Sequence, residues 1–134
     1  GGGLIIEIIK DFVDKLKGKK IILQPNKDAY MLRKFMQENN FSLTLEYAIF
    51  DAKKYYEILV YEEGKNNYSE LELKYGPLLI KNKDTNFIKR ISSKKENLSK
   101  SLKLAKQNEN IYNIQKQIKE IDEVLNNGKN ITSK

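Results

Sequence analysis

The chain of 134 residues contains no cysteine and no histidine. Without cysteine it can form no disulfide, and it offers no thiolate to a metal ion. Without histidine it has no imidazole for acid–base catalysis, and nearly all zinc sites are excluded as well. We therefore expect no metal centre, and any chemistry must rest on other groups.

Long apolar runs are also missing. No run reaches the roughly 18 residues that indicate a transmembrane helix. The apolar start, GGGLIIEIIKDF, is interrupted by acidic residues and has no basic segment before it, so we expect no signal peptide. Lysine and asparagine are abundant, which is typical of intracellular proteins. We expect a cytoplasmic location and no membrane contact.

The formal net charge of +7 is unevenly distributed. Residues 1–80 contain 12 basic and 12 acidic side chains, whereas residues 81–134 contain 13 basic and 6 acidic side chains. A neutral half followed by a basic half is the asymmetry expected of a segment that binds a polyanion. The alternative is that the lysines only keep a solvated helical pair soluble, and the composition leaves both open.

The first half of the sequence alternates between helix and strand patterns. Apolar residues at helical spacing predict a helix over residues 4–16, ended by Gly18. The continuous apolar run Ile21–Leu23 is typical of a strand covered on both faces, and Pro25 ends it. Asn26 is expected to cap the next helix.

That next helix is predicted over about residues 27–39. Two β-rich runs then flank DAKK at residues 51–54, which predicts an antiparallel hairpin with a four-residue loop. Residues 1–80 therefore predict an α/β unit, a layered sheet with helices on its faces that ends in the antiparallel hairpin. Residues 65–84 are interpreted as a polar, turn-rich connector.

The second half predicts two helices. Asp84 is expected to cap the first, and apolar residues then recur at alternating spacings of three and four in two stripes separated by KQNEN. These stripes predict an antiparallel helical coiled-coil hairpin over residues 81–126. The tail, residues 127–134, has little to bury and is expected to be disordered.

Two turns are candidate ligand sites, because ligands of open α/β sheets bind at the carboxyl ends of the parallel strands. One is Gly1-Gly2-Gly3 before the first helix, and the other is Gln24-Pro25-Asn26 after the strand. The glycines allow close approach and expose amide donors, and Gln24 and Asn26 offer donors and acceptors that suit a nucleobase edge. The alternatives are a plain tight turn or cloning scar for the first and a strand end with a helix cap for the second.

Five segments in order are the most specific feature: GGGLI, IILQPN, LRKFMQENNF, KYYEILVYEEG and YSELELKYGPLLIK. This order resembles the C-terminal part of the bacterial tRNA (adenine-22-N1)-methyltransferases, from Gly1 to about Leu125. The resemblance implies a Rossmann-type methyltransferase sheet followed by a coiled coil. It also implies S-adenosylmethionine as cofactor and tRNA as partner, with methyl transfer to N1 of an unpaired adenine.

The resemblance also suggests roles for individual residues. Gly1 and Gly2 look like the last glycines of the turn after the family's fourth strand, and Gln24, Pro25 and Asn26 look like the exit of its fifth. Most of the cofactor site would lie upstream, so the chain alone is expected to be inactive, and it could pair with an N-terminal half or a second copy. The resemblance points to no catalytic side chain.

The basic residues of the first long helix are the candidate contacts for the tRNA backbone: Lys89, Arg90, Lys94, Lys100 and Lys103. Tyrosines near the hairpin could stack on bases, although cross-strand packing is the commoner role for such residues. The rival interpretation is a non-catalytic coiled-coil interaction module or nucleic-acid-binding module.

Overall fold

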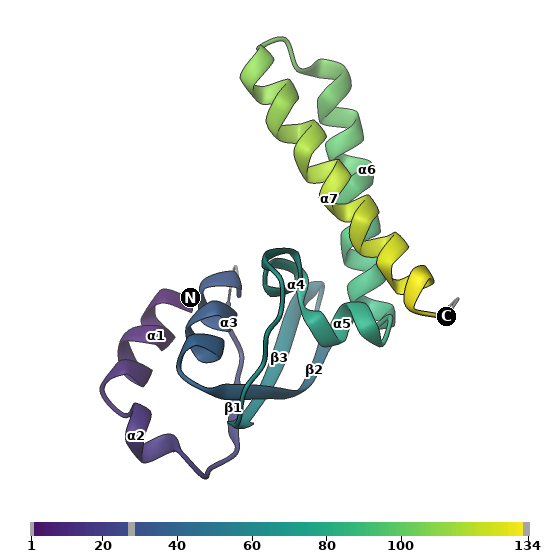
Figure 1. The fold of residues 1–134 in the computed structure, drawn as a ribbon. Coiled ribbons are helices and arrows are strands. Elements are labelled where there is room, and N and C mark those ends of the chain that lie inside the picture. The colour runs from purple at the N-terminus through teal and green to yellow at the C-terminus, as the bar shows by residue number, and fades with distance from the viewer. Residues whose placement is uncertain (1, 27–28, 133–134) are drawn as a thin grey trace.

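A three-stranded antiparallel sheet lies beside several helices, and two long helices project away from it (Figure 1). The computed structural model of the chain describes residues 2–26 and 29–132. Strands β1 (Ile21–Leu23), β2 (Phe41–Asp51) and β3 (Lys54–Glu63) stand in the order β1-β3-β2. The predicted mixed α/β class is confirmed.

The predicted first helix is divided into two, α1 (Gly2–Lys10) and α2 (Val13–Leu16). Gly18 follows with a φ of 78°, a left-handed conformation that ends helices and favours glycine. The role predicted for this glycine is therefore confirmed, and so is the strand that follows it.

β1 is covered on one face only within the described residues. It pairs antiparallel with β3, and its other edge pairs with no strand among residues 2–26 and 29–132. Ile21 is buried, whereas Ile22 is 67% exposed. The prediction of a strand covered on both faces is thus wrong for the described part of the chain, because no described element covers Ile22.

Helix α3 (Tyr30–Glu38) begins later than predicted, because Ala29 and not Asn26 occupies its N-cap position. Residues 27 and 28 lie outside the described part. The helix packs against α1 and joins the core beneath the sheet. Its fully buried members include an arginine as well as apolar residues: Leu32, Arg33 and Met36.

The hairpin is tighter than predicted. Asp51 pairs with Lys54, so the loop is the two residues Ala52 and Lys53, whose φ angles are 48° and 70°. Two consecutive positive φ angles are the geometry of a type I′ turn. Glycine and asparagine usually mark such turns, and their absence explains why the sequence suggested a longer loop.

The segment interpreted as a polar connector contains two short helices, α4 (Glu70–Tyr75) and α5 (Pro77–Lys81). Ser69 caps α4 through a capping box with Glu72, a local signal that the sequence interpretation did not use. The boundary predicted between residues 80 and 81 therefore falls inside α5.

Helices α6 (Thr85–Leu104) and α7 (Asn108–Thr132) form the projecting pair (Figure 1). Asp84 accepts a hydrogen bond from the Phe87 amide at 2.9 Å, which confirms the predicted cap. The base of the pair packs on β2 and α5 through a second apolar cluster: Ala48, Leu79, Ile80, Phe87, Ile91, Ile121 and Val124. The structure assigns residues 127–132, predicted as part of a disordered tail, to α7, and residues 133–134 lie outside the described part.

Candidate functional site

The two turns predicted to bind ligands lie at the same end of the α/β unit. Gly2 opens α1, and the turn after β1 leads into α3, which packs against α1 (Figure 1). Gln24 and Asn26 are exposed and Pro25 is buried. Gly1 lies outside the described residues. The amide side chains are thus accessible to a ligand, and their role remains a prediction.

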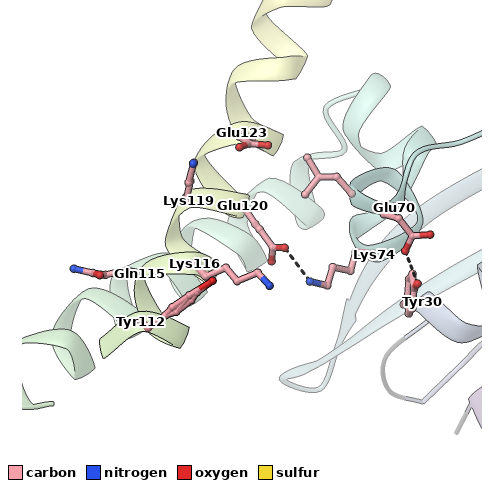
Figure 2. A pocket seen from close by; sticks show the side chains of 10 residues that line it. Tyr30, Glu70, Lys74, Tyr112, Gln115, Lys116, Lys119, Glu120 and Glu123 are labelled. Carbon is pink, nitrogen blue, oxygen red and sulfur yellow. Dashed lines mark hydrogen bonds and ion pairs between the residues drawn. The ribbon is translucent and has the colours of Figure 1, made fainter. Parts of the chain in front are cut away.

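A groove of about 800 Å³ separates the start of α3 and α4 from α7 (Figure 2). Its wall on the projecting pair comes from α7 alone. The lining residues were not predicted as a site: Tyr30, Glu70, Leu71, Lys74, Tyr112, Gln115, Lys116, Lys119, Glu120 and Glu123. Their separation in sequence, across α3, α4 and α7, left no local pattern by which to find them.

Hydrogen bonds fix both walls of this groove. The Tyr30 hydroxyl donates to Glu70, and Lys74 donates to Glu120 at 2.9 Å (Figure 2). Glu120 also accepts from the Tyr75 hydroxyl at 3.3 Å. Burial and the nearby Glu120 carboxylate raise the pKa of Tyr75 to about 12, so this hydroxyl remains a donor at physiological pH.

The basic residues of α6 have different surroundings. The guanidinium of Arg90 lies 5.1 Å from the ring centroid of Tyr55, an arrangement that favours cation–π attraction. Lys100 is exposed and lies 3.7 Å from Glu96. Lys89, Lys94 and Lys103 are exposed as well. At 3.6 residues per turn, Lys89, Lys100 and Lys103 share one face of the helix.

A buried ionic network lies between the sheet and the α4–α5 corner. The Nε of Arg33 donates to Glu46 at 2.8 Å, and its Nη2 donates to Glu57 at 2.8 Å. The Nη1 donates to the Leu73 carbonyl at 3.2 Å. Burial alone would lower the pKa of Arg33, but the two carboxylates offset this effect and raise it. The guanidinium is therefore charged and fully paired.

Glu46 completes this network from β2. One carboxylate oxygen accepts from the Leu78 and Leu79 amides, both at 3.1 Å, at the start of α5. Glu46 is only 5% exposed. It points inward because a β-bulge between Leu43 and Leu45 shifts the alternation of β2 by one residue. The bulge thus places a carboxylate where regular alternation would place Leu45.

Gly76 joins α4 to α5 with a φ of 114°. A Cβ at this position would lie 2.8 Å from Oε1 of Glu46 and 3.0 Å from Nη2 of Arg33. The close approach of this backbone to the network explains the glycine of the YGPLL segment.

We expect Gly76→Ala to destabilise the chain by at least about 2 kcal/mol, through backbone strain and overpacking. Chemical denaturation, monitored by circular dichroism, measures this loss of stability. Gly18→Ala is the matched control, because Gly18 also has a positive φ but a Cβ there would meet nothing within 4 Å. Equal losses for the two variants would contradict a steric role for the network.

Neither a metal site nor a membrane helix is found in the described part of the chain. Residues 2–26 and 29–132 contain no group of three or more acidic side chains that could hold a metal ion. None of the helices in these ranges is both long enough and apolar enough to cross a membrane.

The fold is similar to part of a Rossmann-superfamily protein. It matches a structure from Streptococcus agalactiae described as a protein of the NADB-Rossmann superfamily, with a TM-score of 0.80 and 33% identity, over 93% of this chain and 56% of that one. The chain belongs to the tRNA (adenine(22)-N(1))-methyltransferase family, TrmK, whose family model matches residues 1–126. The resemblance stated from the sequence is therefore confirmed.

Individual relatives agree with this assignment. A tRNA (adenine(22)-N(1))-methyltransferase of Bacillus subtilis is 36% identical over 97 residues, which cover 67% of this chain and 41% of the relative. Sp1610 of Streptococcus pneumoniae, a candidate tRNA (m1A22) methyltransferase, matches with a TM-score of 0.85 and 32% identity, over 93% of this chain and 58% of Sp1610. A second structure of Sp1610, in complex with S-adenosyl-L-methionine, matches with a TM-score of 0.80 and 32% identity, over 93% of this chain and 56% of Sp1610. The chain thus spans about half the length of these relatives.

Proposed function

We propose that this chain forms the C-terminal part of a methyltransferase that modifies N1 of an unpaired tRNA adenine with S-adenosylmethionine. The match of the family model over residues 1–126 carries this proposal, because it covers the α/β unit and most of the projecting helices together. A non-catalytic interaction module would need only one of these parts. The tRNA substrate supports a cytoplasmic location.

The residues of this chain would orient the substrate. Gln24 and Asn26, both exposed, would hold the edge of the adenine after it leaves its helix. Gly1 and Gly2 would lie against the cofactor, and a Cβ at the neighbouring Gly3 would meet nothing within 4 Å, which leaves room for a ligand to approach. When bound, S-adenosylmethionine supplies an electrophilic methyl group. The protein contributes positioning and a polar environment.

The projecting helices would hold the tRNA. We propose that Lys89, Lys94, Lys100 and Lys103 contact phosphates of the tRNA backbone. Arg90 would add a further phosphate contact when its guanidinium leaves the Tyr55 ring. We further propose that α6 and α7 form a short antiparallel coiled coil. In support, Lys95 of α6 forms an ion pair with Asp122 of α7, 2.5 Å away.

The chain is also proposed to pair with a further polypeptide. The unpaired edge of β1 within the described residues and the exposure of Ile22 support this proposal, since an apolar strand edge is a template for another strand. The N-terminal part of a relative and a second copy of this chain are the two candidate partners.

A chimera tests the proposed function. The chain alone is expected neither to methylate tRNA nor to bind S-adenosylmethionine with micromolar affinity, because most cofactor contacts would lie in the part of the relatives that it does not span. Fusing the N-terminal part of Sp1610 before Gly1 is expected to restore both activities. Isothermal titration calorimetry measures the binding, and transfer of a labelled methyl group measures the reaction.

Two tRNA substrates complete this experiment, one with adenine at position 22 and one with guanine there. Methylation of the adenine form alone is expected. A folded chimera that binds the cofactor but methylates neither tRNA would contradict the proposed function. Micromolar cofactor binding by the 134-residue chain alone would contradict the division of the site between the two parts.

A further inference from the structure

The groove between α4 and α7 has a position and a chemistry that the proposed function does not use. Tyr30 lines it and is the first residue of α3, which follows the Gln24-Pro25-Asn26 turn. One end of the groove is therefore only a few residues along the chain from the predicted adenine site, and the other end lies on the projecting helices. An RNA strand that delivers an adenine to that turn would have this groove beside it.

One aromatic side chain on the α7 wall has its ring available. Tyr112 is 57% exposed, and it lies on the same helical face as Lys116 and Lys119, at spacings of four and seven residues. Exposed aromatic rings beside basic side chains are the usual means by which proteins stack single-stranded bases.

The charges of the lining indicate a single nucleotide and not a long polyanion. The groove has three lysines and three glutamates. Two of these carboxylates already accept hydrogen bonds, Glu120 from Lys74 and Glu70 from Tyr30. Within the described part of the chain, Lys116 and Lys119 take part in no ion pair.

Lys116 lies where it can meet an anion. It points from α7 toward Lys74 of α4 across the groove (Figure 2). Lys74 is already paired with Glu120 at 2.9 Å, so Lys116 is the cation at this point that is left for a phosphate. The amide of Gln115 adds a group that can bond to the polar edge of a base.

We propose that this groove binds an unpaired nucleotide of the RNA substrate, with its base stacked on Tyr112 and its phosphate held by Lys116 and Lys119. The inference rests on the proposed function, because that function supplies the RNA. It gives α7 the contact with unpaired RNA, whereas the outward lysines of α6 contact the backbone elsewhere.

The test uses the full 134-residue chain and a single-stranded RNA oligonucleotide that carries 2-aminopurine. The fluorescence of 2-aminopurine reports both binding and stacking of the base. Tyr112→Ala is expected to weaken binding about tenfold and to remove most of the fluorescence quenching caused by stacking. Tyr112→Phe, which keeps the ring, is expected to bind like the wild type. Circular dichroism checks that each variant folds.

A pair of double variants tests the phosphate contact. Lys116→Ala/Lys119→Ala is expected to reduce the slope of log K against log salt by about 0.7, the value for one phosphate of a single strand. Lys19→Ala/Lys20→Ala makes the same charge change at two exposed lysines outside the groove and outside α6, and it is expected to leave the quenching of 2-aminopurine unchanged.

Wild-type quenching and affinity in Tyr112→Ala would overturn the groove proposal. If Lys89→Glu/Lys100→Glu/Lys103→Glu on α6 weakens tRNA binding while the groove variants bind tRNA like the wild type, the groove proposal is wrong and the proposed function stands. If the wild-type chain does not bind the oligonucleotide even at low salt, the groove proposal is also wrong, and methylation by the chimera still tests the enzyme assignment separately.

Discussion

Arg33→Met is expected to lower the free energy of unfolding of this chain by about 3–5 kcal/mol, because it removes one partner of a buried ion pair. Glu46 would be left as a buried carboxylate with only the amides of α5 as donors. The carbonyl oxygens of Leu73 and Lys74 would also lose the donor that Arg33 provides. Since small domains are stable by only about 5–15 kcal/mol, this loss is a large part of the total.

The other arginine of the chain supplies the control. Arg90 is exposed and contacts only the face of Tyr55 among the interactions found for it, so Arg90→Met is expected to lower stability by about 1 kcal/mol or less. Urea denaturation followed by circular dichroism measures both variants. A loss below about 1 kcal/mol for Arg33→Met would show that the network contributes little to the fold.

A triple variant separates lost packing from an uncompensated charge. Arg33→Met, Glu46→Leu and Glu57→Gln together remove the charges of the network and keep much of its volume. This variant is expected to recover part of the stability lost in Arg33→Met, because apolar replacement of a whole buried ionic network is often neutral or stabilising. No recovery would indicate that the amide contacts of Glu46 are the larger contribution.

The network also positions the projecting helices. It joins α3, β2 and β3 to the corner at Gly76, and α5 on the far side of that corner packs against α7. We therefore expect the buried charges to help position the base of α7 relative to α3.

Local patterns predicted most of the elements correctly. The helical stripe before Gly18, the strand at Ile21, the antiparallel hairpin and the Asp84 cap all depend on neighbouring residues, and all are present. The errors arose where a local signal was weak or unusual. Ala52 and Lys53 form a tight turn without glycine, and the capping box of Ser69 was taken for part of a loop.

The buried network could not be predicted in this way. Arg33 stands beside Lys34 and resembles a solvated charge, and its burial depends on partners that are 13 and 24 residues further along the chain. Glu46 is buried because of the β-bulge, which a count of alternating residues does not show. The groove was missed for a related reason, because α3, α4 and α7 meet only in the folded chain.

The outward face of α6 is expected to determine the salt dependence of tRNA binding. Lys89→Glu/Lys100→Glu/Lys103→Glu in this chain is expected to weaken tRNA binding and to flatten the slope of log K against log salt by up to about 2.7, or about 0.9 for each phosphate that is no longer neutralised. Arg90 is left intact, because it contacts Tyr55 and its replacement would also disturb packing. Titrations of tRNA binding at several salt concentrations measure both quantities.

The matched control reverses three exposed lysines of the other half: Lys19, Lys20 and Lys65. It changes the net charge by the same amount, so any general loss of attraction for RNA affects both variants equally. Only the α6 variant is expected to show the flattened slope, because only that face would touch phosphates, whereas long-range attraction is screened within about 8–10 Å at physiological salt. If both variants keep the wild-type slope, the lysines of α6 serve only to solvate the helical pair. If both flatten it equally, the chain attracts tRNA through its net charge and α6 is not the contact surface.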